Sequence, residues 1–166
     1  MTTLADGSYR ARLLARVGDQ GTMDALAESA SRVEAVAREL GPAGLARPWG
    51  PGKWTGAQVL VHMVDSEIAI GFRSRQVLAE REHRMQEFDE VAWMGLYGPT
   101  DAAGALEAFL AVRQWNLALW RRLTPEQLGR VGFHPSRGEE AVETTLRALA
   151  GHTLSHLAQL EALLDR

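Results

Sequence analysis

The fold is decided by residues 54–80, which read WTGAQVLVHMVDSEIAIGFRSRQVLAE. Thr55 and Gln58 have the spacing of a capping box, in which each side chain accepts a hydrogen bond from the other residue's backbone. Such a box marks the first turn of a helix, and the apolar residues that follow recur at helical spacing. The stretch therefore predicts a long helix that begins at Thr55 and ends near Glu80.

Three more helices are predicted around this one. The first covers about 22–40 and ends at Gly41-Pro42, a pair that favours the end of a helix. The other two cover about 101–123 and 143–164, where apolar residues again recur every three or four positions. The chain therefore contains four long helices, each with one apolar face to bury.

The connections between these helices differ in length. Residues 81–99 form a long connection between the second and third helices, and residues 124–127 form a second capping box that opens a short turn. Residues 129–139 are expected to form a loop. Long connections are uncommon in small domains and are often functional. We therefore expect an all-α protein, a four-helix bundle with one long crossover connection, in a single domain that covers 1–166.

The composition agrees with this prediction and excludes several classes of protein. The 25 Ala and 22 Leu residues outnumber the 13 Val and Ile residues, which favours helix over strand. The 18 basic residues are interspersed with 21 acidic ones, so no basic stripe predicts a nucleic-acid partner. No apolar run approaches the roughly 20 residues that a membrane span requires. Since cysteine is absent, any metal ligands must be histidines or carboxylates, and we expect a cytoplasmic protein.

Two histidines on the last predicted helix are candidate metal ligands. His152 and His156 lie one turn apart, and a helical wheel places both at or near the inner, apolar face. Helices use this spacing to present two imidazole nitrogens to one metal ion. The alternative is a pair of core histidines that form hydrogen bonds with their neighbours.

A third histidine, His62, lies on the inner half of the second predicted helix. Packed helices lie about 8–10 Å apart, so His62 can meet His152 and His156 around one ion. Three nitrogen ligands would leave coordination positions open, as in catalytic sites. The two other histidines are expected elsewhere: His83 on the solvated surface and His134 in a turn.

Two arginines lie on the inner faces of the predicted helices. Arg113 lies within the apolar stripe of the third helix, and Arg73 lies about 20° from His62 on the helical wheel. Because a guanidinium is seldom buried alone, each needs a partner. One interpretation pairs them with a carboxylate such as Asp89, or lets their side chains extend to the solvated end of the bundle. The other makes Arg113, Arg73 and Asp89 a substrate-binding wall beside the metal. Both stay open.

These motifs, taken in order, resemble the DinB-like (YfiT-like) superfamily from about residue 22 to the end of the chain. The residues that carry the resemblance are Gly52-Lys53-Trp54-Thr55, His62, Asp65-Ser66-Glu67, Phe88-Asp89, Trp93, Arg113, His134-Pro135, Gly138 and the run HTLSHLAQL at 152–160.

The resemblance implies a metal-binding four-helix bundle, often dimeric. In this family a divalent nickel or zinc ion is held by three histidines, which fall here at His62, His152 and His156. One difference is Thr153, where many members have an aspartate. That aspartate could orient a ligand ring, so the difference removes a supporting residue but no ligand.

Three functions are compatible with these observations. The leading hypothesis, implied by the resemblance, is an S-transferase that conjugates a small thiol such as bacillithiol or mycothiol to an electrophile. A metal ion lowers the pKa of a bound thiol, so the protein needs no cysteine of its own. The second is a hydrolase with metal-activated water, for which Asp65, Glu67 and Asp89 are candidate bases, although Glu67 is expected to point away from His62. The third is a non-catalytic, stress-related metal-binding protein.

An outward apolar set on the second predicted helix suggests a partner. Val61, Ile68 and Phe72 share one side of this helix, opposite the inner face. Exposed apolar clusters often mark protein interfaces, and the alternative is that the crossover connection covers this set. We therefore expect a homodimer that uses this side of the helix.

Overall fold

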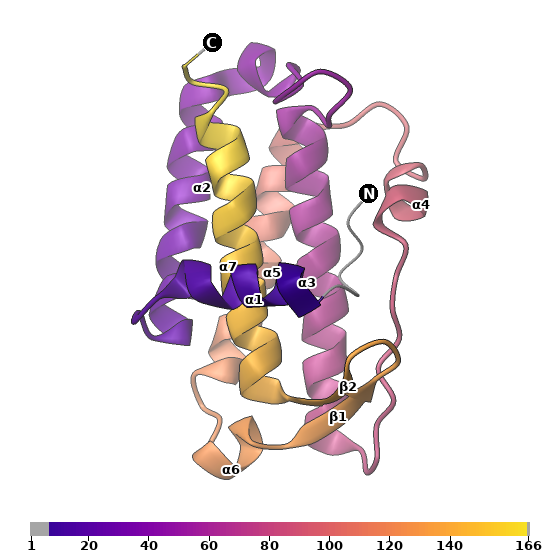
Figure 1. Cartoon of the computed structure of the whole chain (residues 1–166). Coiled ribbons are helices and arrows are strands. Elements are labelled where there is room, and N and C mark those ends of the chain that lie inside the picture. Colours follow the sequence, from indigo (N-terminus) through magenta and orange to yellow (C-terminus); the bar gives the residue numbers. More distant parts are fainter. Residues whose placement is uncertain (1–6, 166) are drawn as a thin grey trace.

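Four long helices form the body of the molecule, and a computed structural model describes residues 7–165 of the chain. The helices are α2 (Thr22–Leu45), α3 (Gly56–Ala79), α5 (Ala102–Trp120) and α7 (Val142–Glu161). They pack side by side along their lengths (Figure 1). The prediction of an all-α four-helix bundle is confirmed.

The connection between α3 and α5 runs back along the whole bundle (Figure 1). It contains a short helix, α4 (Glu90–Met94), which the sequence did not predict. Because this crossover returns the chain to the end where α3 began, α3 and α5 run in the same direction. The helix α7 runs opposite to α3, beside it (Figure 1).

The start of α3 follows its predicted signal, whereas the predicted end of the first helix does not. At the start of α3, the Thr55 hydroxyl accepts a hydrogen bond from Gln58 N at 3.2 Å, and Gln58 Oε1 accepts one from Thr55 N at 2.9 Å. The predicted end of the first helix is a kink, since Gly41 has a φ of 59°. Glycine adopts this left-handed conformation without steric cost, so a further turn follows before α2 ends.

The predicted loop at 129–139 is wrong, because this segment forms most of a hairpin. Its strands are β1 (Val131–His134) and β2 (Gly138–Ala141), paired antiparallel. Each strand has four residues, too few to show a clear alternation of apolar and polar positions. Two backbone hydrogen bonds between Phe133 and the crossover, to His83 O at 2.9 Å and from Met85 N at 2.8 Å, attach the hairpin to the end of α3.

A further helix, α1 (Gly7–Val17), was not predicted and lies across α7 (Figure 1). Leu13 and Val17 are buried on its inner side. The crossing point is Gly151 of α7, where a Cβ atom would lie only 1.9 Å from the backbone oxygen of Leu13. The absence of a side chain at Gly151 therefore allows the two helices to touch through their backbones.

No helix within residues 7–165 combines the length and apolar character that crossing a bilayer would require. Residues 1–6 and 166 lie outside the described part of the chain. The expected single domain of 1–166 can therefore be compared with the structure only over residues 7–165.

Candidate metal centre

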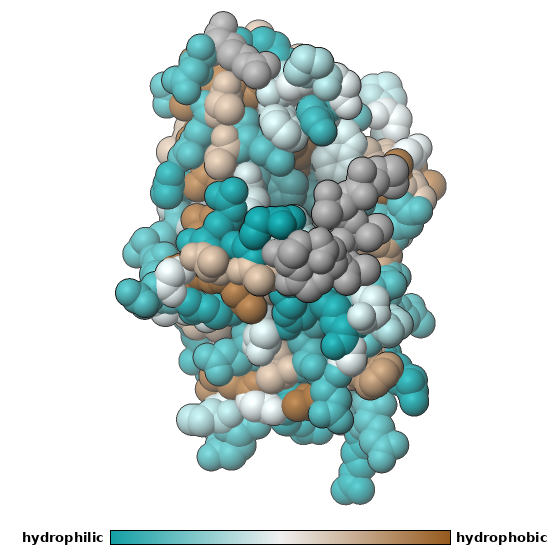
Figure 2. All heavy atoms as spheres, viewed as in Figure 1, coloured by the Kyte–Doolittle hydropathy of each residue, from teal (hydrophilic) through white to brown (hydrophobic). Residues whose placement is uncertain are grey.

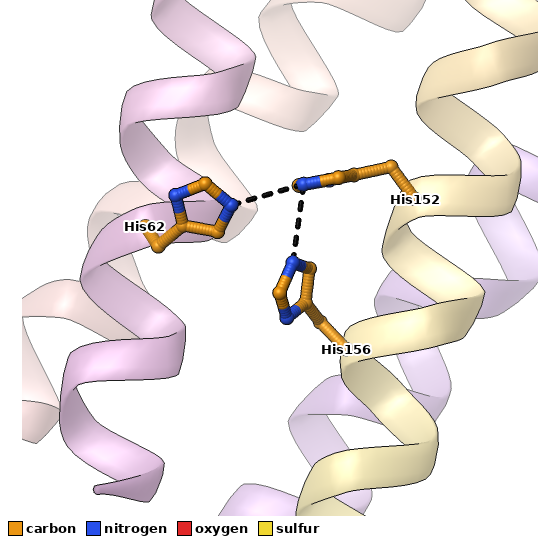
Figure 3. Close-up of side chains that lie close together, drawn as sticks. All are labelled: His62, His152 and His156. Carbon is orange, nitrogen blue, oxygen red and sulfur yellow. Dashed lines mark hydrogen bonds between the residues drawn. The ribbon is translucent and has the colours of Figure 1, made fainter. Parts of the chain in front are cut away.

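Three histidine side chains converge between α3 and α7. His62 reaches from α3, while His152 and His156 reach from successive turns of α7 (Figure 3). The Nε2 atom of His152 lies 3.0 Å from Nε2 of His62 and 3.1 Å from Nε2 of His156. The structure therefore brings together the three residues that the sequence nominated as ligands.

Burial makes these rings poor bases. It lowers the pKa of His62 to about 3, with a smaller contribution from the charge of His156. Burial also lowers the pKa of His156 to about 4, although its hydrogen bond with Gln159 acts in the other direction. The pKa of His152 lies well below its ordinary value, through burial first and then through the charges of its neighbours. All three imidazoles are therefore neutral at pH 7, the form that binds metal.

The arrangement of nitrogen atoms fits a cation. Gln159 Oε1 lies 2.8 Å from His156 Nδ1, so Nδ1 carries the proton and Nε2 of this ring keeps its lone pair. One potential ligand atom from each of the three histidines lies within 4.8 Å of the other two. Lone pairs that face one another repel, and a shared cation removes that repulsion. Three imidazole nitrogens are the donor set that zinc and nickel accept.

A buried network of polar side chains explains why Arg113 can lie in the interior of the bundle. The Arg113 guanidinium donates to Glu67 Oε1 from Nε at 2.9 Å and from Nη2 at 2.6 Å. It also donates to the Thr153 hydroxyl at 2.8 Å and to the Leu26 carbonyl oxygen at 2.5 Å. Both ends of the ion pair are buried, with side-chain exposures of 1% for Arg113 and 0% for Glu67. This is a structural ion pair within the core.

Arg113 therefore pairs with a buried carboxylate, as one of the two sequence interpretations expected, but not with the carboxylate that was named as the example. Its partner is Glu67 rather than Asp89, whose Oδ1 instead caps α4 by accepting from Val91 N and Ala92 N, both at 3.0 Å. Asp89 is exposed on the crossover. Because the guanidinium of Arg113 is fully engaged in the interior, the expected contact of Arg113 with a substrate stays a prediction that this arrangement does not favour.

The candidate bases do not reach the histidines. Glu67 pairs with Arg113 in the core, which agrees with the expectation that Glu67 points away from His62. Asp65 is buried on another side of α3 and accepts a hydrogen bond from the Tyr97 hydroxyl. Burial raises the pKa of Asp65, and this hydrogen bond in turn raises the pKa of Tyr97 to about 12. None of these acids lines the cavity next to the histidines.

That cavity has a volume of about 50 Å³ and is lined by both His62 and His152. Arg73 of α3 lies on its wall and is 6% exposed. Among the described residues that line the cavity, Glu140 of β2 is the only carboxylate. The cavity therefore combines the candidate metal ligands with charged side chains on its walls.

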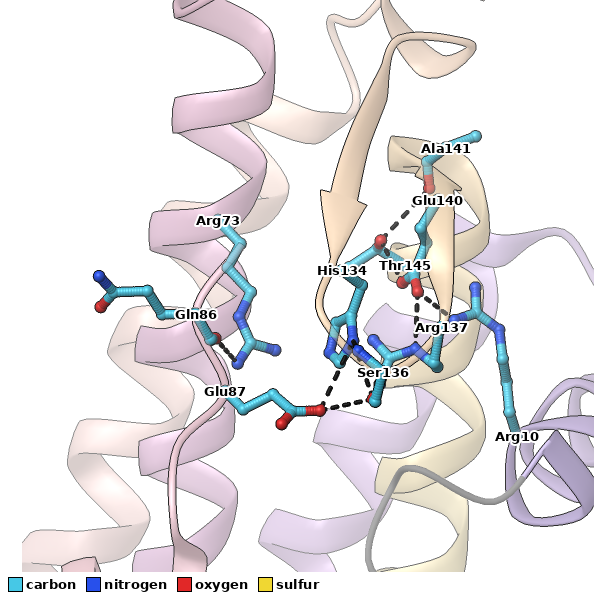
Figure 4. Close-up of polar contacts among 10 residues, drawn as sticks. All are labelled: Arg10, Arg73, Gln86, Glu87, His134, Ser136, Arg137, Glu140, Ala141 and Thr145. Carbon is cyan, nitrogen blue, oxygen red and sulfur yellow. Dashed lines mark hydrogen bonds and ion pairs between the residues drawn. The ribbon is translucent and has the colours of Figure 1, made fainter. Parts of the chain in front are cut away.

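Glu140 is fully engaged by its neighbours (Figure 4). Its Oε2 atom accepts from Arg137 Nε at 2.8 Å and from Arg10 Nη1, and its Oε1 atom accepts from the Thr145 hydroxyl at 2.6 Å. Although burial alone would raise its pKa, these donors lower the pKa of Glu140 to about 2. Glu140 is therefore ionised at neutral pH and is a poor proton acceptor.

Comparison with known proteins assigns the chain to a family. The profile of the DinB superfamily matches residues 25–160. The chain belongs to the DinB superfamily. YfiT of Bacillus subtilis, named as a candidate metal-dependent hydrolase, is 30% identical over 122 residues, which make up 72% of this chain and 68% of that protein.

A relative of this DinB superfamily member in Oceanobacillus iheyensis has the same type of name. It is 30% identical over 118 residues, 69% of this chain and 67% of the relative. The solved structure of Bacillus subtilis YfiT, described as having an unusual four-helix bundle topology, has a TM-score of 0.81 and 26% identity. The match covers 87% of this chain and 85% of that one. The family resemblance inferred from the sequence motifs is confirmed.

Two other histidines of this DinB superfamily member lie where the sequence did not place them. The His83 side chain is only 10% exposed, with Nδ1 3.1 Å from Glu80 Oε2, so its assignment to the solvated surface was wrong. His134 is buried at the end of β1, where Ser136 contacts its Nδ1 atom. Burial lowers the pKa of His134 to about 4. Both corrections follow from the hairpin, which covers this end of the bundle.

Several residues of the site were missed by sequence reasoning. Gln159 stands three residues after His156, so helical spacing alone could have nominated it as the partner of that ring. Arg10, Arg137 and Glu140 come from α1 and the hairpin, two elements that were not predicted, and no local signal connects them with the histidines.

Proposed function

We propose that this DinB superfamily member is a divalent-metal-dependent enzyme with His62, His152 and His156 as metal ligands. The observation that carries the proposal is the convergence of three Nε2 atoms beside a cavity. Nickel and zinc both suit such a nitrogen site, with nickel favoured by intrinsic affinity and either favoured by its availability in the cell. Three protein ligands leave coordination positions open for a reactant.

The chain's own residues prepare this site. Burial keeps the three imidazoles neutral, and Gln159 holds His156 with its Nε2 lone pair directed at the cluster. When bound, a divalent ion lowers the pKa of water or of a thiol and supplies a nucleophile at neutral pH. Glu140 is already occupied by its donors, so the cavity offers a surface that binds and orients a reactant rather than a protein base.

Hydrolysis is the reaction that the relatives support. YfiT of Bacillus subtilis and the relative from Oceanobacillus iheyensis both have names that assign them to this class. Water that enters the cavity would lie next to His62 and His152, which line its wall. The proposed hydrolase would therefore attack a small ester or amide that fits beside these two rings.

An S-transferase is the second candidate, with bacillithiol or mycothiol as the thiol. One observation favours it: apart from the two ligand histidines, the described residues on the cavity wall include no histidine, lysine or tyrosine that could protonate a leaving group. Hydrolysis of an amide requires such a donor to protonate the departing amine. Addition of a thiolate to an electrophile expels no amine, so it does not require this donor. The arginines of the wall would suit the carboxylates of bacillithiol.

Metal analysis tests the ligand assignment. Protein without a histidine tag is purified as wild type and as His62→Ala, His152→Ala and His156→Ala, and its metal content is measured by inorganic mass spectrometry. We expect about one ion per chain in the wild type and a large loss in each variant. His83→Ala is the matched control, because His83 lies outside the cluster and should leave the metal content unchanged. Unchanged stoichiometry in all three ligand variants would refute the site.

Activity measurements then separate the functions. The metal-loaded protein is supplied with nitrophenyl esters in one series, and with bacillithiol or mycothiol plus a fluorogenic bimane electrophile in another. Hydrolysis that is lost in His152→Ala supports the hydrolase, and conjugation that is lost in this variant supports the S-transferase. Full metal occupancy without either reaction would shift the assignment to a non-catalytic metal-binding protein.

A further inference from the structure

Three arginines from separate parts of the chain line the cavity beside the histidines. Arg10 comes from α1, Arg73 from α3 and Arg137 from the turn between β1 and β2. Glu140 supplies the only negative charge among the described lining residues. The wall therefore carries three positive charges and one negative charge. On the same face of the molecule, strongly hydrophilic side chains also gather between α1 and the hairpin (Figure 2).

Of the three arginines on the cavity wall, Arg73 is the one whose charge is least compensated by neighbouring groups. Among the described residues its one hydrogen bond is from Nη2 to the carbonyl oxygen of Gln86, and no carboxylate lies within ion-pair distance. Its guanidinium also lies 5.8 Å from the centre of the Phe88 ring. Figure 4 shows the guanidinium directed from α3 toward the hairpin. A buried guanidinium without a counter-ion is costly, so an anion in the cavity would stabilise it.

Arg137 faces the same space from the hairpin. Glu140 accepts from Nε of Arg137, and within the described part of the chain the two terminal nitrogens of Arg137 have no hydrogen-bond partner. Glu140, which also accepts from Arg10 and Thr145, therefore holds Arg137 through Nε alone. Glu140 therefore positions the Arg137 guanidinium and makes no hydrogen bond to Arg73.

We propose that Arg73 and Arg137 bind a carboxylate group of the substrate, with Glu140 and Arg10 as positioning residues. A guanidinium fork matches a carboxylate with two parallel hydrogen bonds. The cavity of about 50 Å³ holds roughly three to five water-sized groups, and a carboxylate has three heavy atoms. Since His62 and His152 line the same cavity, a substrate held by its carboxylate would present its remaining atoms to the metal ligands.

This inference rests on the proposed function for its substrate but is tested without activity. Succinate is titrated into metal-free protein in low-salt buffer, and binding is followed by calorimetry and by the NMR signals of the arginine Nε–H groups. We expect one saturable site, with the signals of Arg73 and Arg137 shifting together. No saturable shift at either arginine would overturn the proposal, and this measurement requires no variant.

Substitution provides the second arm of the test. Arg73→Gln should weaken succinate binding by about tenfold or more. Arg73→Lys keeps the positive charge but lacks the two parallel donors, so its affinity for succinate should lie between those of the wild type and of Arg73→Gln. Arg38→Gln is the matched control, because Arg38 is an exposed arginine paired with Glu34 on α2. Equal weakening by Arg38→Gln and Arg73→Gln would mean that general electrostatic attraction is responsible, and would overturn the site.

The two proposals fail in different ways. If succinate does not bind while His62, His152 and His156 still retain metal, the carboxylate site is wrong and the metal site stands. If succinate binds as expected but the three histidine variants keep full metal content, the anion site stands and the proposed function is wrong.

Discussion

Replacing Arg113 by methionine should be among the most damaging substitutions in this chain. Methionine fills much of the same volume but leaves the Glu67 carboxylate buried without its cation. Breaking a buried ion pair from one side typically costs about 3–5 kcal/mol of unfolding free energy. Domains are usually stable by about 5–15 kcal/mol, so the Arg113→Met protein should still fold but unfold much more readily.

Urea denaturation followed by circular dichroism measures this effect. With a slope of about 2 kcal/mol per molar urea, a loss of about 4 kcal/mol moves the midpoint down by about 2 M. Arg38→Met is the matched control: its partner Glu34 is exposed, and a surface pair of this kind contributes less than about 1 kcal/mol.

A double variant identifies the cause. Glu67→Leu combined with Arg113→Met removes both charges, so it should recover most of the stability that Arg113→Met loses. The recovery should be incomplete, since Asn116 also donates to Glu67 Oε2 at 3.0 Å and the Leu26 carbonyl oxygen loses its donor. A single variant that loses less than about 1 kcal/mol, or a double variant no more stable than the single, would refute the reasoning.

Three further predictions concern pH, metal affinity and assembly. The folded-state pKa values of His62 and His156, about 3 and about 4, lie below the ordinary 6.5, so the unfolded chain binds more protons between these limits. The unfolding free energy of metal-free protein should therefore fall as the pH drops from about 6.5 to 4, by about 1.4 kcal/mol per pH unit for each histidine; constant stability in urea titrations would contradict this. Gln159→Leu should weaken metal binding about 10- to 100-fold in a competition titration, because His156 loses the acceptor that orients it. We also expect a homodimer through exposed Ile68 and Phe72, which Phe72→Glu should convert to monomer in light scattering, whereas a monomeric wild type would exclude the interface.

The third member of that predicted interface was misplaced. Val61 is only 6% exposed and belongs to the hydrophobic core of the monomer. Its helical angle was read correctly, but the end of the crossover and the first turns of α5 lie beside Val61. A helical wheel shows only which residues share a side of a helix. Which sides are covered depends on elements far away in the sequence.

Local patterns predicted the bundle and its histidines. Capping at Thr55 and the apolar periodicity of α7 are encoded within a few residues, so the helices and the inward placement of His152 and His156 could be inferred without a structure. The pairing of Arg113 could not. The wheel placed it in the interior, but whether Glu67 or Asp89 meets it depends on how α3 and α5 pack.

One physical reason explains why the sequence did not predict α1 and the hairpin. The helix α1 has 11 residues, and the strands of the hairpin have four each. Segments this short have weak intrinsic preferences and are stabilised mainly by the surface on which they lie. Since α1 and the hairpin supply Arg10, Arg137 and Glu140, three of the four charged residues of the cavity wall could not be predicted from the sequence.

The backbone contact at Gly151 links the position of α1 to the width of the cavity. A methyl group at position 151 would stand 1.9 Å from the Leu13 oxygen, 1.1 Å inside the 3.0 Å that real Cβ atoms keep. The helix would have to lift by at least that amount, and Arg10 and Leu13, which line the cavity, would lift with it. Among natural sequences with this architecture, a larger residue next to the first histidine of α7 should therefore accompany a wider cavity. A single carbon atom would then set the size of molecule that fits beside the histidines.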